Sequence, residues 1–80
     1  MNDASILSRI NELMSEEHAI LDREGAGERR AEDHERLREL QTTLDQCWDL
    51  LRQRRALRET GNDPDLAQPR SEGVVEHYVQ

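Results

Sequence analysis

The stretch LRELQTTLDQCWDLLRQRRALR, residues 37–58, decides the fold of this chain. Alternating spacings of three and four residues separate its seam positions, the pattern by which one helix packs along another. These seam positions are Leu37, Leu40, Leu44, Cys47, Leu51 and Arg54. Trp48, Leu50 and Leu57 widen the seam into an apolar face, and arginines gather toward its end. The stretch therefore predicts a long amphipathic helix.

A second apolar face lies closer to the N-terminus. Asn2 or Asp3 can cap its first turn, because the side-chain oxygen of either residue accepts a hydrogen bond from an exposed amide. Gly25 and Gly27 predict its end, since glycine adopts the left-handed cap conformation at no steric cost. The apolar residues of this predicted helix are Ile6, Leu7, Ile10, Leu13, Met14, Ile20 and Leu21.

Only a few residues separate the two predicted helices. Residues 28–33 contain acidic side chains suited to a positive helix N-terminus, so the second helix is predicted to begin there and to end near Thr60-Gly61. A connection this short folds the helices back on each other. The predicted fold is all-α, an antiparallel helical hairpin over residues 1–60 with a C-terminal extension over residues 61–80.

The extension opens with polar residues and prolines. Asp63 before Pro64 can cap a single helical turn that runs through Ala67, as aspartate before a first-turn proline often does. Ser71 can cap a further short helix, and we expect that segment to dock on the hairpin. The apolar residues of this last candidate helix are Val75, Tyr78 and Val79.

Composition narrows the class of protein. Eighty residues make one domain at most, and a chain this short is near the limit for supporting its own core. Hydrophobic residues make up 34% and charged residues 36%, but the apolar residues recur at helical spacing, which disfavours disorder. The net charge of −7 argues against binding to nucleic acid or to anionic membranes.

Cysteine usage and the N-terminal residues indicate a compartment. The single cysteine cannot form an intrachain disulfide, which favours a reducing environment. The polar start Met1-Asn2-Asp3 shows no secretory signal, and no apolar run is long enough to span a bilayer. We therefore expect a cytoplasmic protein.

Histidine and cysteine offer little for a transition metal. A di-iron bundle uses Glu-x-x-His pairs, and none of the three histidines here has glutamate three residues before it. A structural zinc site needs cysteines or histidines at close spacing, and Cys47 has no such neighbour. We expect no transition-metal site and no cofactor.

An acidic loop at residues 61–72 is the candidate for calcium. Aligned with the twelve-residue EF-hand loop, it places Asp63, Asp65 and Glu72 at ligand positions three, five and twelve. Position one is Gly61, and position six is Leu66 instead of glycine. A calcium-responsive small regulator that uses this degenerate loop is the alternative function.

The remaining chemical candidates are interpreted as structural. Cys47 lies on the seam, where burial raises the pKa of a thiol, and Trp48 suits the edge of an apolar face better than a ligand groove. The arginines of residues 52–58 lack interleaved aromatic residues, so ion pairs with another helix explain them better than nucleic-acid binding. No motif supplies a nucleophile, base and oxyanion donors, so we expect no enzyme activity.

The run LDQCWDLLRQRRA, residues 44–56, resembles the hallmark of a family of short actinobacterial proteins of unknown function. Residues 6–13, Glu17-His18, residues 34–37 and the ending at residues 75–79 are similar as well, so the resemblance covers nearly the whole chain. It implies a soluble helical protein with no established activity and no catalytic residues to transfer.

Both predicted helical faces are broader than one contact can cover. A lone hairpin would expose a larger apolar patch than soluble monomers usually tolerate. We therefore expect a homodimer that forms a four-helix bundle, or pairing with another protein, in a non-enzymatic interaction or assembly module. The predicted core and interface residues are Ile6, Ile10, Leu13, Leu37, Leu40, Leu44, Cys47, Trp48 and Leu51.

Overall fold

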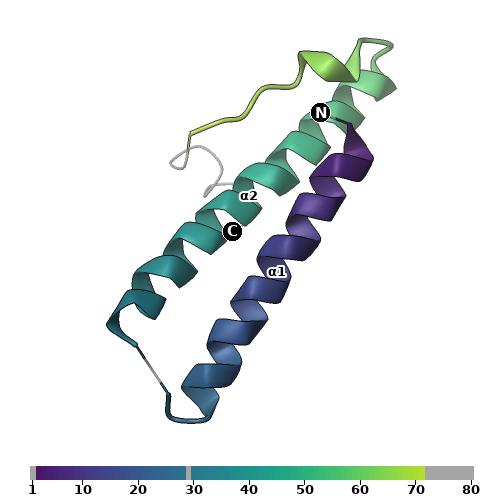
Figure 1. Cartoon of the computed structure of the whole chain (residues 1–80). Helices are drawn as coiled ribbons and strands as arrows, with labels where there is room; N and C mark the ends of the chain where they lie inside the picture. The colour runs from purple at the N-terminus through teal and green to yellow at the C-terminus, as the bar shows by residue number, and fades with distance from the viewer. Residues whose placement is uncertain (1, 29, 72–80) are drawn as a thin grey trace.

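The computed structural model describes residues 2–28 and 30–71. This part of the chain forms three elements, α1 (Asp3–Gly25), α2 (Ala31–Glu59) and the short 3-10 helix η1 (Pro64–Leu66). Figure 1 shows α1 and α2 lying side by side in opposite directions, so that the start of α1 meets the end of α2. The molecule is elongated, with extents of 51 × 24 × 17 Å. The predicted antiparallel helical hairpin is confirmed.

The start of α1 is fixed by a reciprocal cap. The Asn2 side chain accepts a hydrogen bond from the Ser5 backbone N–H at 2.8 Å, and Ser5 Oγ accepts one from the Asn2 N–H at 3.1 Å. Both amides would otherwise lack an intrahelical partner. The cap predicted at Asn2 or Asp3 is therefore formed by Asn2.

Each helix is followed by a glycine with positive φ. Gly27 has φ +80° and Gly61 has φ +76°, a conformation that costs glycine nothing. In each case the next amide reaches back to a carbonyl in the last helical turn, from Glu28 to Arg23 and from Asn62 to Leu57, both at 2.8 Å. The predicted stops are confirmed, with Gly25 still inside α1 and Gly27 making the turn.

The core is one narrow seam between the two helices. Leu40 has 0% of its surface exposed, and Leu37, Leu50 and Leu51 pack partly buried against the cluster. The buried hydrophobic residues are Ile6, Ile10, Leu13, Ile20, Leu40, Leu44 and Cys47. A single partner helix covers only a stripe of each helix, which is why the seam is thin.

The apolar faces are only partly covered within one chain. Leu7, Met14 and Leu21 of α1 are 45%, 40% and 46% exposed, and Trp48 of α2 is 41% exposed. Trp48 therefore lies outside the core of the hairpin, which corrects its prediction as a core residue; its role in an interface stays a prediction. On α2, Leu50 packs partly buried against the core, so the outward-facing apolar surface is smaller than the sequence indicates.

The extension begins as predicted. The Asp63 side chain accepts a hydrogen bond from the Asp65 N–H at 2.9 Å, and Pro64 opens η1. The chain then runs back along α2 on the side away from α1, where Gln68 and Arg70 hydrogen bond to glutamines of α2 (Figure 1). The further segment predicted to dock on the hairpin, around Val75, Tyr78 and Val79, lies outside the described residues, so its docking stays a prediction.

The start of α2 offers a route to higher stability. Arg30 occupies the N-cap position with extended dihedrals, φ −117° and ψ 149°, but its side chain caps no amide. Arg30→Asp supplies an acceptor and replaces a positive charge at the positive helix end, so we expect the free energy of unfolding to rise by about 1 kcal/mol. Urea unfolding measures the change. Arg30→Ala only removes the charge, so it should raise the free energy of unfolding by no more than a few tenths of the rise expected for Arg30→Asp. A drop in stability for Arg30→Asp would contradict the N-cap assignment.

Candidate interaction surfaces

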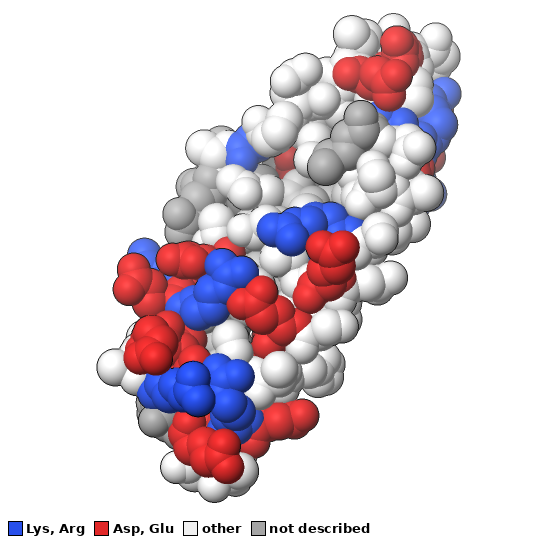
Figure 2. All heavy atoms as spheres, in the orientation of Figure 1, with Lys and Arg blue, Asp and Glu red and all other residues white. Residues whose placement is uncertain are grey.

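One flank of the hairpin is held together by charged side chains. Arg36 of α2 pairs with Glu16 of α1 through two hydrogen bonds, one of them 2.8 Å from Nη2 to Oε1, and it also reaches Glu39 at 3.1 Å. Nearer the bend, Arg23 donates to Asp33 at 2.7 Å. Figure 2 shows acidic and basic side chains interleaved over the half of this face nearest the bend. We call this side the charged flank. Its ion pairs join particular residues of α1 and α2 and so help to fix the register of the two helices.

The opposite flank is apolar, and the ion pair between Glu16 and Arg36 locates it. Arg36 directly precedes Leu37 of the seam, and Glu16 directly precedes residue 17, which continues the spacing of the seam between Leu13 and Ile20. The residues that directly follow buried seam residues therefore lie on the other side of the hairpin. On α1, Leu7, Met14 and Leu21 follow Ile6, Leu13 and Ile20, at a spacing of seven residues. On α2, Trp48 follows Cys47. We call Leu7, Met14, Leu21 and Trp48 the apolar flank.

The open end of the hairpin holds a buried arginine. Arg54 continues the seam of α2, is 7% exposed, and donates to Asp3 of α1 at 2.5 Å and to Asp65 of η1 at 2.9 Å. Arg58 donates to the same Asp3 carboxylate at 2.7 Å. One arginine thus joins three elements. The predicted pairing with an acidic residue of another helix is confirmed for Arg54 and Arg58, whereas Arg55 pairs with Glu59 of α2 itself at 3.0 Å.

These ion pairs lower the pKa of three carboxyl groups. Hydrogen bonds from Arg58 and Arg54 lower the pKa of Asp3, one from Arg36 lowers that of Glu16, and one from Arg54 lowers that of Asp65. A depressed pKa in the folded state contributes stability that is present above the unfolded pKa near 4 and is lost as pH falls through the folded value.

Acid is therefore expected to weaken the hairpin. The urea midpoint should fall steadily as pH is lowered from about 5 to about 2, because all three carboxylates bind protons more readily once the chain is unfolded. Asp3→Asn removes one of the three groups and should make the fall shallower. A midpoint that does not change across this range would show that these pairs contribute nothing in solution.

A polar line runs along the side of α2 that the extension covers, and the sequence analysis missed it. Gln46, Asp49 and Gln53 lie three and four residues apart, and Asp49 is only 1% exposed. Asp49 accepts a hydrogen bond from Gln53 at 2.8 Å and lies 3.5 Å from Arg70 of the extension. We call Gln46, Asp49 and Gln53 the outer face of α2.

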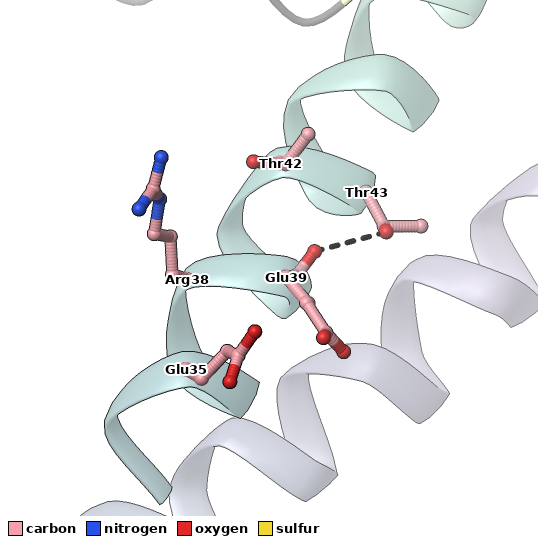
Figure 3. Close-up of a pocket in the computed structure, with 5 residues that line it drawn as sticks. All are labelled: Glu35, Arg38, Glu39, Thr42 and Thr43. Carbon is pink, nitrogen blue, oxygen red and sulfur yellow. Dashed lines mark hydrogen bonds between the residues drawn. The ribbon is translucent and has the colours of Figure 1, made fainter. Parts of the chain in front are cut away.

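A hollow on the described surface lies along a single helix. Its volume is about 420 Å³, and its lining residues are Glu35, Arg38, Glu39, Thr42 and Thr43, all from α2 (Figure 3). Thr43 Oγ1 donates to the Glu39 carbonyl at 3.0 Å, and the Glu39 carboxylate accepts from Arg36. These side chains are engaged in helix and ion-pair contacts, and no second element closes over them among the described residues.

The candidate calcium ligands that the structure describes already make hydrogen bonds within the chain. Asp63 caps η1 and Asp65 pairs with Arg54, while Glu72 lies outside the described residues. A cation at Asp65 would compete with a guanidinium already in place. Across residues 2–28 and 30–71, no group of three or more histidine, cysteine or acidic side chains is arranged to hold a metal ion.

The cysteine behaves as a packing residue. Cys47 is part of the buried core, and burial raises the pKa of its thiol above the ordinary value. A raised pKa disfavours the thiolate, which is the reactive form. The interpretation of Cys47 as a core residue is confirmed.

The comparisons with known proteins find relatives of this chain in mycobacteria. Searched over its described residues, the chain has no helix both long enough and apolar enough to cross a membrane. Uncharacterised proteins of Mycobacterium tuberculosis and Mycobacterium bovis are 46% identical over 80 aligned positions, covering 96% of this chain and 90% of each relative. No solved structure shows significant similarity to it. The family described as protein of unknown function (DUF2630) matches residues 2–80, and the chain belongs to this family.

Proposed function

We propose that the chain is a non-enzymatic assembly module of the cytoplasm that pairs with a second copy of itself through the apolar flank. The observation that carries this proposal is the line of Leu7, Met14 and Leu21 beside Trp48, each at least 40% exposed. Exposed apolar residues repeating every seven positions are typical of a helix that packs against a further helix. A contiguous apolar patch of this kind marks an interaction site on soluble proteins.

The thin core supports the same proposal. A hairpin of this size buries seven hydrophobic side chains in one seam, which is little for a domain that must fold alone. Two hairpins joined at their apolar flanks form a four-helix bundle with a second layer of packing. The lone cysteine, buried in the seam, suits a reducing compartment.

A second copy of the chain is the partner that this flank favours. A twofold axis is the commonest way for identical chains to bury the same patch. Pairing about such an axis covers the exposed Leu7, Met14, Leu21 and Trp48 of both copies at once.

The ion pairs of the charged side chains support a non-catalytic role. Several of the described charged side chains pair between elements, as Asp3 does with Arg54 and Arg58. The hollow of about 420 Å³ is open and lined by one helix, whereas a catalytic site needs groups that converge from several sides.

Sedimentation equilibrium at micromolar concentration tests the proposal. We expect about 19 kDa, twice the chain mass of 9.3 kDa. Met14→Glu places a charge at the centre of the flank and should return the mass of one chain, whereas the matched control Ser8→Glu, exposed on α1 outside the flank, should stay paired. The proposal would be overturned by a folded wild-type monomer whose unfolding midpoint does not change when the protein is diluted.

A further inference from the structure

The outer face of α2 is built to hold an extended chain. The Gln53 side chain donates from Nε2 to the Gln68 carbonyl at 2.6 Å and accepts from the Gln68 N–H at 3.2 Å, so it pairs with both backbone groups of one residue. Two residues further along, the Arg70 carbonyl accepts from Gln46 Nε2 at 3.2 Å. These contacts involve only backbone groups of the docked segment, as in the pairing of a peptide with a sheet edge.

A buried carboxylate adds selectivity to this face. Asp49 lies between the two glutamines and is 1% exposed, although a charged side chain is seldom so deeply buried unless it is paired. It accepts from Gln53 at 2.8 Å, which holds the amide in position for Gln68, and it lies 3.5 Å from the Arg70 guanidinium. A hollow of about 200 Å³ lies beside this pair, lined by Asp49, Arg52, Gln53, Ala56 and Arg70.

The segment that occupies the face has no regular secondary structure. Residues 67–71, which we call the strap, contain no regular helix, and Leu66 just before them is 62% exposed. The hydrogen bonds of the strap to α2 join polar groups that water can replace at modest cost, and Ala67 and Pro69 line a hollow of about 170 Å³ with Ile6 and Leu50. An occupant held in this way can exchange with a competing segment of the same chemistry.

We propose that the outer face of α2 is a binding site for an extended segment of a partner protein that carries arginine, and that the strap occupies it until the partner displaces it. The partner segment presents one residue with free backbone N–H and C=O groups to Gln53 and an arginine two positions later to Asp49. The site is separate from the apolar flank and does not depend on self-association.

The test uses the full chain with its strap released. Gln68→Pro removes the N–H that Gln53 accepts from, and Arg70→Ala removes the guanidinium, while α2 itself is unchanged. The probe is a fluorescent, end-capped peptide with the sequence of residues 62–71. We expect saturable binding to the released variant that is at least about tenfold tighter than to wild type, because the tethered strap competes at high effective concentration.

Matched controls address the two recognition elements. A peptide with glutamine in place of its arginine should bind at least about tenfold more weakly, and adding Gln53→Ala to the released variant should abolish binding of the original peptide. If the released variant keeps its helical circular dichroism but shows no saturable binding at millimolar peptide, the proposal fails. It also fails if the glutamine peptide binds equally well.

Hydrogen exchange in the intact chain provides an independent test if the released variant does not fold. The amide of Gln68 should be protected in wild type and lose that protection in Gln53→Ala, while amides in the middle of α2 stay protected. A Gln68 amide that exchanges at the unprotected rate in wild type would show that the outer face does not hold extended backbone.

Discussion

An Ile10→Asp chain is expected to be largely unfolded at neutral pH and 25 °C. Ile10 is 2% exposed at the middle of the seam. The substitution removes a buried apolar side chain, which costs about 2–5 kcal/mol, and adds the desolvation of a carboxylate among apolar neighbours. A domain of this length has roughly 4–12 kcal/mol of total stability, so the combined loss consumes most or all of it.

Far-UV circular dichroism measures the outcome. The helical signal of wild type should be largely absent in Ile10→Asp, and no cooperative thermal transition should remain. Ser8→Asp is the matched control, since it places the same charge on an exposed position of α1 two residues earlier, and it should keep the wild-type signal. Equal helicity in the two variants would mean that the seam does not support the fold.

Leu40→Ala is expected to lower the free energy of unfolding by about 2–5 kcal/mol. Leu40 has no exposed surface and stands among the buried residues of the seam, where a single layer of packing leaves few neighbours to close over a cavity. Leu44→Ala should fall in the lower half of this range, because Leu44 is 8% exposed.

Urea unfolding at one fixed protein concentration measures this loss, because pairing of chains makes stability depend on concentration. Glu12→Ala is the control: Glu12 is exposed on α1 and its carboxylate pairs with the neighbouring Arg9 at 3.3 Å, so stability should change by less than about 0.5 kcal/mol. Similar losses for Leu40→Ala and Glu12→Ala would show that the faces of the helices are assigned wrongly.

The helices and their ends were predictable because their causes are local. Asn2 and Ser5 cap one another within a single turn, and Gly27 and Gly61 take a backbone conformation open to few other residues. The spacing of the buried leucines in α2 repeats a pattern that depends only on helix geometry. Neither feature needs information from distant parts of the chain.

The candidate surfaces were predictable only in part. The sequence places Leu7, Met14 and Leu21 on one broad apolar face and predicts Trp48 as a core or interface residue, since hydrophobicity alone does not tell the centre of a buried helix face from its edge. In the sequence, Asp49 is one of several acidic residues close to the arginines of α2. The signal that could have found it is its spacing from Gln46 and Gln53, which places three hydrogen-bonding side chains on one line of α2.

The sequence by itself determined an all-α hairpin, the ends of its helices and the seam between them, because periodicity and capping act within a few residues. Only the tertiary structure decided which apolar residues stay exposed and which charges become buried. Asp3 and Arg54 meet although 51 residues separate them, and Asp49 is enclosed where Arg70 lies beside it. Burial depends on what packs against a side chain, and that partner comes from a distant part of the chain.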